Sequence, residues 1–83
     1  MNYYVYIIRC ADGTLYTGTT NDVARRVSVH NSGKGAKYTR SRLPVKVVYW
    51  ESCVDKPSAL QREYEIKKMT RERKLHLVAE QDS

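Results

Sequence analysis

Two runs of strand-forming residues separated by a short turn constrain the fold of this chain more than any other feature of its sequence. The residues from Tyr3 to Arg9 are almost all β-branched or aromatic, and Leu15 to Thr19 form a second such run. The segment Ala11-Asp12-Gly13 lies between them and is typical of a hairpin turn. The sequence therefore predicts that the chain begins with an antiparallel β-hairpin.

The length of the turn decides which side chains share a face of this hairpin. A three-residue loop would end on a left-handed Gly13 and would pair Tyr6 with Gly18. Tyr16 would then lie opposite Ile8, and Tyr6 and Tyr16 would point to the same face. A two-residue Asp-Gly turn would put the two tyrosines on opposite faces. We predict the three-residue loop.

The rest of the chain contains signals for one more strand and three helices. The expected elements are a helix over Val23–Asn31, a strand over Val45–Glu51, a helix over Ser58–Met69 and a helix over Arg71–Glu80. Their expected caps and first residues are Thr20, Asn21 or Asp22, then Pro57 and Ser58, then Thr70. The segment between the first helix and the third strand reads as a glycine-bearing basic loop. The order ββαβαα predicts an α+β fold, with a small antiparallel sheet and helices packed on it.

The 83 residues suffice for one compact domain, which we expect to span residues 1–83 with a core from about 3 to 78. The chain is 41% hydrophobic and 29% charged, which is typical of a globular protein rather than a disordered one. No apolar run approaches the roughly 20 residues of a membrane span, and the first residues lack the pattern of a signal peptide. We therefore expect a cytoplasmic protein without membrane contact.

Two cysteines, Cys10 and Cys53, lie 43 positions apart. Small secreted domains usually carry more cysteines at tighter spacing, so free thiols are the preferred interpretation. A zinc site built from these cysteines with His30 and His76 is the alternative. No pair of them has the local spacing that brings two zinc ligands together.

The positive charge of the chain is gathered in one segment. Between Val23 and Trp50 there are seven basic residues and no acidic one, so this segment carries +7 and the remainder −1. A domain with its positive charge in one third of the chain suits a polyanionic partner. Basic surface charge that only keeps the protein soluble is the alternative interpretation.

One carboxylate lies among residues that would face the core. On a helical wheel of the helix expected over Ser58–Met69, Glu63 falls between Ala59 and Leu60. A buried carboxylate needs a partner, and an ion pair with Lys67 one turn later would provide it. A divalent cation held through oxygen would do so equally well. Both interpretations are open from the helical wheel alone.

Arg26 and His30 lie one turn apart on the first helix and share a face. Such a basic pair can bind a phosphate, because Arg offers a planar donor fork and His can exchange a proton near neutral pH. Two solvated residues at the rim of the core are the alternative. Tyr6 and Tyr16 are similarly open to two interpretations, as packing residues or as hydroxyl groups at a site.

These positions together resemble the GIY-YIG nuclease module over nearly the whole chain, from about Tyr3 to Val78. The matching residues are Val5-Tyr6, Tyr16-Thr17-Gly18, Arg26 eight residues after that glycine, His30, and Glu63 on a later helix. The segments Asp12-Gly13-Thr14-Leu15-Tyr16-Thr17-Gly18 and Gly33-Lys34-Gly35-Ala36-Lys37-Tyr38 are similar to small stand-alone bacterial members. The resemblance implies a central three-stranded antiparallel sheet flanked by helices, and hydrolysis assisted by one metal ion.

The resemblance also implies a role for each of five side chains. Glu63 would hold a Mg²⁺ or Mn²⁺ ion bound to the scissile phosphate. Tyr16 would help to deprotonate the attacking water, with Tyr6 beside it as an orienting hydroxyl or substitute base. Arg26 would neutralise the non-bridging oxygens. His30 would relay the proton or position the water.

The basic segment would supply contacts to nucleic acid. Gly18 would leave room for close approach to the substrate, and Tyr38 would stack on a base. The expected nucleic-acid-binding residues are Gly18, Lys34, Lys37, Tyr38, Arg40 and Arg42.

The hypothesis is a Mg²⁺-dependent endonuclease that acts on DNA rather than RNA, with a role in DNA repair or processing. Its specificity would come from the basic loop, from a protein partner or from the structure of the DNA. A non-catalytic nucleic-acid-binding module or accessory subunit with the same fold is the alternative. The set Tyr16, Arg26, His30 and Glu63 favours the nuclease, because binding a polyanion needs no acidic residue at the phosphate.

Overall fold

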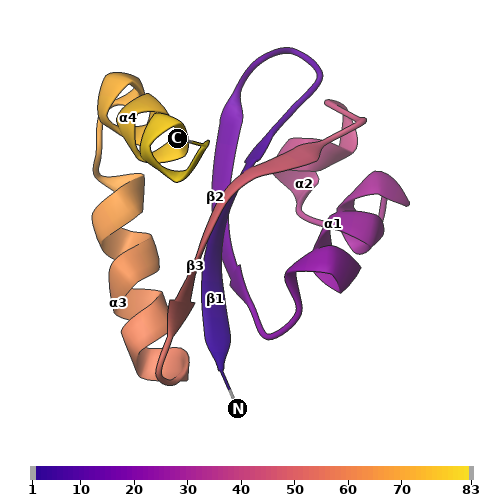
Figure 1. Cartoon of the computed structure of the whole chain (residues 1–83). Helices are drawn as coiled ribbons and strands as arrows, with labels where there is room; N and C mark the ends of the chain where they lie inside the picture. Colours follow the sequence, from indigo (N-terminus) through magenta and orange to yellow (C-terminus); the bar gives the residue numbers. More distant parts are fainter. Residues whose placement is uncertain (1, 83) are drawn as a thin grey trace.

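The computed structural model of this chain describes residues 2–82. Its elements are β1 (Tyr3–Arg9), β2 (Leu15–Thr20), α1 (Val23–Asn31), α2 (Lys37–Arg40), β3 (Lys46–Cys53), α3 (Lys56–Lys67) and α4 (Arg71–Asp82). The strands form one antiparallel sheet in the order β2-β1-β3. Figure 1 shows α3 and α4 on one side of this sheet and α1 and α2 on the other. The predicted α+β class and three-stranded antiparallel sheet are confirmed.

The hairpin between β1 and β2 has the predicted three-residue loop. The Cys10 amide donates to the Thr14 carbonyl at 2.8 Å, and the Gly13 amide donates to the Cys10 carbonyl at 2.9 Å. Gly13 adopts a φ of +86°, a left-handed conformation that favours glycine. The resulting register puts Tyr6 and Tyr16 on the same face of the sheet, as predicted.

The central strand β1 is buried on both faces, which divides the core into two layers. Val5 and Ile7 pack with Ala59 and Ile66 of α3 on one face. The side chains of the other face form a second cluster, which consists of Tyr6, Ile8, Cys10 and Val45 with Tyr16, Val23, Val27, Leu43 and Val47 around it. The site residues of β1 and β2 therefore belong to the α1 face, and α3 covers the opposite face.

Helix caps set the starts of the helices on either side of the sheet. Asp22 accepts a hydrogen bond from the Arg25 amide and begins α1, and Thr70 accepts one from the Arg73 amide before α4, as predicted. Helix α3 begins at Lys56, earlier than predicted, because Asp55 caps it. None of the helices in residues 2–82 is long and apolar enough to span a membrane.

The basic loop predicted between the first helix and the third strand contains a short helix, α2. This single turn of four residues makes four helices in residues 2–82, where the sequence predicted three. Four residues are too few to produce a helical hydrophobic period, so the sequence carried no signal for it. Thr39 of this turn is fully buried, which shows that the segment is packed onto the core rather than projecting into solvent.

Candidate active site

The five side chains predicted to carry the chemistry come from four elements of the fold. Tyr6 lies on β1 and Tyr16 on β2, while Arg26 and His30 lie on the same helix, α1. Glu63 lies on α3, which packs on β1 and β2 from the opposite face of the sheet. The predicted residues therefore lie on helices on both sides of the sheet, with Glu63 on the side opposite Arg26 and His30 (Figure 1).

His30 lies between the two tyrosines and is fully buried. Its Nε2 atom is 3.0 Å from the Tyr6 hydroxyl, and its Nδ1 atom is 2.9 Å from the hydroxyl of Thr39. The centroid of the Tyr16 ring lies 5.6 Å from that of the imidazole, edge to face. His30 is thus a core residue with both ring nitrogens in hydrogen bonds, and the alternative of a solvated rim residue is wrong for it.

Two glycines make the room that this arrangement requires. A Cβ atom at Gly18 would lie 2.5 Å from the Tyr6 hydroxyl oxygen, and a Cβ atom at Gly35 would overlap His30 Nδ1. Neither position has room for any side chain. The space beside Gly18 is therefore filled by the Tyr6 ring rather than left open for a substrate, because tertiary packing brings that ring against β2.

The hydroxyl of Tyr6 is subject to opposing electrostatic influences. Burial raises its pKa, a hydrogen bond and the positive charge from Arg26 lower it, and the charges of Tyr16 and Glu63 raise it. Arg26 and Glu63 thus act on one hydroxyl from helices on opposite faces of the sheet. In the structure Tyr6 is hydrogen-bonded to His30, whereas the ion pair of Glu63 is with Lys67 of its own helix.

The imidazole of His30 is held in its neutral form. Burial lowers its pKa, and the positive charge of Arg26 lowers it further. A neutral imidazole carries one N–H donor and one nitrogen acceptor. His30 can therefore accept a proton at one nitrogen while it donates at the other.

Arg26 also reaches solvent. It lines a cavity of about 210 Å³ together with Thr20, Asn21, Asp22, Arg25 and Val29. The neighbouring Arg25 is exposed, so two guanidinium groups lie beside one cavity. This side of α1 offers an approach for an anion toward Arg26.

The carboxylate of Glu63 is mostly covered but not sealed. Its side chain is 20% exposed, and its Oε1 atom lies 3.8 Å from the ammonium of Lys67, whose side chain is 52% exposed. A pair this long and this exposed is worth at most a few tenths of a kcal/mol. The predicted ion pair exists, and it leaves the carboxylate able to take another positive partner.

The chemistry of this carboxylate fits a hard divalent cation. Residues 2–82 contain no group of three His, Cys, Asp or Glu side chains that could enclose a metal ion. Mg²⁺ does not need such a group, because it keeps several waters and is commonly held by one or two carboxylates and a substrate phosphate. Cys10 and Cys53 are free thiols, as predicted.

The aromatic residue of the basic segment is engaged within the protein. The Tyr38 ring stacks on Tyr16 with centroids 5.9 Å apart, and the Arg42 guanidinium lies 4.1 Å from the Tyr38 centroid. Arg42 also forms a 3.0 Å salt bridge with Asp12 in the hairpin loop. Two of the predicted nucleic-acid-binding residues, Tyr38 and Arg42, therefore tie the segment to the site.

The other predicted basic contacts face solvent. Lys34, Lys37 and Arg40 are all exposed, and Arg40 makes a side-chain hydrogen bond to the Gly35 carbonyl at 3.3 Å. Three positive groups thus lie on the short segment that also holds Tyr38. Within residues 2–82 none of the three forms a salt bridge, so a polyanion can bind them without breaking one.

Sequence reasoning missed two residues of this site, Thr39 and Gly35. Thr39 contacts His30 from a helix that the sequence did not predict, and Gly35 makes room for the same ring. Thr39 lies nine residues after His30, a separation that does not indicate contact in any regular element. A glycine inside a segment that must pass close to a helix could have indicated a close approach.

Comparison with known proteins shows the family of this chain. The model of the GIY-YIG catalytic domain matches residues 2–76. A UPF0213 protein of Staphylococcus epidermidis is 55% identical over 78 residues, which cover 94% of this chain and 95% of the relative. A UPF0213 protein of Desulfotalea psychrophila is 57% identical over 77 residues, which cover 92% of this chain and 70% of the relative.

Two solved structures have the same fold. The solution NMR structure of a UPF0213 protein from Bacillus halodurans is 51% identical, with a TM-score of 0.61 over 95% of this chain and 84% of that one. The solution NMR structure of a protein from E. faecalis is 39% identical, with a TM-score of 0.60 over 89% of this chain and 79% of that one.

Proposed function

This chain belongs to the family of GIY-YIG catalytic domains, and from that premise we propose that it is a divalent-metal-dependent endonuclease. Its substrate is a nucleic-acid phosphodiester, DNA in preference to RNA, and its cellular role is DNA repair or processing in the cytoplasm. The basic segment, a protein partner or the structure of the DNA supplies the specificity.

The observation that carries this proposal is the buried hydrogen bond between Tyr6 and His30, with the ring of Tyr16 packed against the same imidazole. Arg26 lies one turn before His30 on α1, and the partly covered carboxylate of Glu63 lies on α3. A group that binds anions, a carboxylate for a cation and a proton acceptor are the parts that phosphodiester hydrolysis requires.

In this proposal each side chain has one task. Glu63 binds Mg²⁺ or Mn²⁺, which when bound stabilises negative charge on the phosphate and on the leaving oxygen. Arg26 binds the non-bridging oxygens of the scissile phosphate. Tyr6 and Tyr16 present the hydroxyls that orient and deprotonate the attacking water, and His30 accepts or relays the proton.

The exposed basic groups of the segment around α2 hold the nucleic-acid backbone. Lys34, Lys37 and Arg40 contact phosphates on either side of the scissile bond. Arg42 contributes mainly by fixing Tyr38 against Tyr16, because its guanidinium is already paired with Asp12. Gly18 contributes by leaving the space that the Tyr6 ring fills.

The test compares two glutamates of the same helix. Glu63→Gln keeps the size of the side chain and removes its charge, and we expect it to lower Mg²⁺-dependent cleavage of labelled DNA by about 100-fold or more. Binding of the same DNA in EDTA should be kept or slightly tightened, since one negative charge leaves a polyanion site. Glu65→Gln is the matched control, because Glu65 is 49% exposed and pairs with Arg62.

A second pair of variants tests the tyrosines in the same assay. Tyr16→Phe should abolish cleavage, whereas Tyr64→Phe should not, because Tyr64 is 59% exposed on α3. If Glu63→Gln cuts as well as the wild type, the nuclease assignment fails. A nucleic-acid-binding module or accessory subunit is then the better description.

A further inference from the structure

Thr39 lies beneath the candidate site and takes no part in the roles assigned above. It is fully buried on α2, with its hydroxyl 2.9 Å from His30 Nδ1 and 2.9 Å from the Ala36 carbonyl. A buried hydroxyl with two partners has to distribute one proton and its lone pairs between them. The partners of Thr39 fix that distribution.

The Ala36 carbonyl decides the direction of the Thr39 hydroxyl. A carbonyl oxygen can only accept, so the short contact is a hydrogen bond only if Thr39 donates to it. If Thr39 donated to His30 instead, two oxygen lone pairs would face each other at 2.9 Å in a buried place. Thr39 therefore accepts a hydrogen bond, and the donor is the Nδ1–H group of His30.

The other end of the imidazole follows from this arrangement. His30 is neutral, so a proton on Nδ1 leaves Nε2 as an acceptor. Among residues 2–82, the Tyr6 hydroxyl is the hydrogen-bond partner of Nε2, at 3.0 Å, so it must donate to this nitrogen.

We propose that Thr39 is a positioning residue that holds His30 in the Nδ1–H tautomer, so that Nε2 accepts the proton of the Tyr6 hydroxyl. The hydrogen bonds then run in one direction, from Tyr6 to His30, from His30 to Thr39 and from Thr39 to the Ala36 carbonyl. The opposite tautomer would reverse the first of them and would leave Nε2 without a lone pair for a proton.

This inference rests on the proposed function and names the path of the proton within it. The attacking water gives a proton to the Tyr6 oxygen while Tyr6 passes its own proton to His30 Nε2. The resulting hydroxide forms the new P–O bond, and the ester oxygen leaves with the electrons of the broken P–O bond and takes a proton from solvent. His30 ends as an imidazolium and returns its proton after product release.

The surroundings of His30 suit a proton acceptor that must start neutral. The groups that face it are Tyr6 from β1, Tyr16 from β2, Arg26 from α1 and Thr39 from α2. None of these four is a carboxylate that would hold the imidazolium form in the ground state. The hydrogen bond between His30 Nδ1 and Thr39 therefore determines which ring nitrogen carries the proton.

The experiment reads the tautomer directly by long-range ¹H–¹⁵N NMR of the imidazole rings. The chain has only two histidines, and the exposed His76 serves as the internal reference. Wild-type His30 should show Nδ1 protonated and Nε2 unprotonated at neutral pH. Thr39→Val keeps the shape and removes the hydroxyl, so His30 should shift toward the Nε2–H form.

The rate of DNA cleavage is measured for the same Thr39 variant and for two further variants. Thr39→Val should lower the kcat of Mg²⁺-dependent DNA cleavage by about 10- to 100-fold with little change in KM, as removal of a tautomer-fixing partner does elsewhere. Thr39→Ser should restore both the tautomer and the rate. Thr17→Val is the matched control, because Thr17 is also buried and its hydroxyl has no hydrogen-bond partner within residues 2–82.

The outcomes separate this inference from the proposed function. An Nε2–H tautomer in the wild type, or a Thr39→Val variant with unchanged tautomer and kcat, would overturn the role of Thr39. The wild type could cut no nucleic acid while the tautomer of His30 still depends on residue 39. That result would support the positioning by Thr39 and contradict the nuclease function.

Discussion

Gly18 illustrates how far the site depends on the absence of a side chain. Replacing it by alanine would put a Cβ atom 2.5 Å from the Tyr6 hydroxyl oxygen and 2.7 Å from Cζ, so the Tyr6 ring would have to move. We expect Gly18→Ala to lower the free energy of unfolding by about 1–3 kcal/mol, the usual cost of overpacking. Urea denaturation measures this, and cleavage should disappear with it because the hydrogen bond between Tyr6 and His30 would break.

Gly13→Ala serves as the control for that experiment. Gly13 has a φ of +86° and open space around the position of a Cβ, so its substitution strains the backbone by about 1–2 kcal/mol without touching Tyr6. This variant should be less stable and still active. Equal loss of activity in both variants would contradict the role assigned to Gly18.

The burial of His30 also makes stability depend on pH. Its pKa is held below the ordinary 6.5, so the unfolded chain binds a proton in a range where the folded protein does not. The stability from the neutral ring is fully present above about pH 6.5 and is lost as the pH falls toward the lowered pKa. We expect the free energy of unfolding to fall between pH 7.5 and 5.5, where carboxylates remain ionised.

The variant His30→Gln isolates this contribution. Its side chain does not titrate, so the difference between wild type and variant should shrink as the pH falls through that range. Denaturation at several pH values measures it, with His76 retained in both proteins. A wild-type curve that is flat or rises toward acid would show that His30 is not held neutral.

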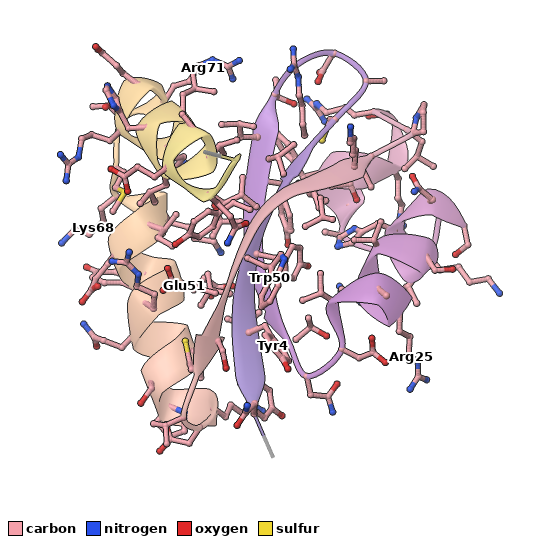
Figure 2. All side chains as sticks on the ribbon, in the orientation of Figure 1. Tyr4, Arg25, Trp50, Glu51, Lys68 and Arg71 are labelled. Carbon is pink, nitrogen blue, oxygen red and sulfur yellow. The ribbon has the colours of Figure 1, made fainter. Side chains whose placement is uncertain are left out.

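A cluster of polar residues joins α3 to β3 beside Glu63 in the sequence. Arg62 forms a 2.6 Å salt bridge with Glu51 on β3, and Tyr49 donates a hydrogen bond to the same carboxylate. Figure 2 shows Glu51 on the α3 side of the sheet. Burial, followed by the hydrogen bond and charge of Glu51, raises the pKa of Tyr49 to about 12, so its hydroxyl remains a donor. Because Arg62 and Glu63 are neighbours on one helix, fixing one fixes the direction of the other.

Removing the salt bridge between Arg62 and Glu51 should destabilise the fold. Arg62→Ala leaves Glu51 partly buried without its cation, and we expect the free energy of unfolding to fall by about 1–3 kcal/mol. Lys67→Ala, which removes a longer and more exposed pair, should change it by less than about 0.5 kcal/mol. Urea denaturation compares the two, and similar values for both would contradict a special role for the salt bridge between Arg62 and Glu51.

Sequence patterns predicted those elements whose caps, turns and apolar stripes lie within the element itself or next to it. The bounds of α1, Val23–Asn31, match because the Asp22 cap and the apolar stripe lie within the helix and its first turn. The register of β1 and β2 followed from the turn before Thr14. Helix α2 was not predictable, because its single turn is held by contacts of Tyr38 and Thr39 with residues of other elements.

For the candidate site, the sequence could name residues but could not predict how they are arranged. Local patterns left Tyr6, Tyr16, Arg26, His30 and Glu63 open between packing and functional roles, and the resemblance to the GIY-YIG module selected them as candidates. The burial of His30 and its contact with Thr39 depend on how α2 folds back over α1. No pattern of hydrophobic residues reports which nitrogen of a ring meets which hydroxyl, so that part required the structure.

The distribution of charge over the whole molecule predicts where nucleic acid binds. Lys34, Lys37 and Arg40 are exposed on the α1–α2 side, and their combined replacement by alanine should weaken DNA binding strongly. The slope of log Kobs against log salt concentration should become shallower by about one for each basic side chain that no longer binds a phosphate. Fluorescence anisotropy of a labelled oligonucleotide at several salt concentrations measures both quantities.

A control variant with the same change in net charge tests whether DNA binds this face of the protein or responds only to its total charge. Lys56, Lys68 and Arg71 are exposed, and Figure 2 shows Lys68 and Arg71 on the α3–α4 side of the molecule. Their combined replacement by alanine should reduce binding much less. Equal effects of the two triple variants would mean that the protein attracts DNA only through its total charge of +6.

The decisive measurement is cleavage by the wild-type protein of single-stranded, duplex, nicked and branched DNA and of RNA, each with Mg²⁺, Mn²⁺ or EDTA. We predict that one or more of the DNA substrates is cut with either metal and none is cut in EDTA. RNA should be cut more slowly than the best DNA substrate. Tight, salt-sensitive binding without cleavage under any of these conditions would contradict the assignment of this chain as a nuclease.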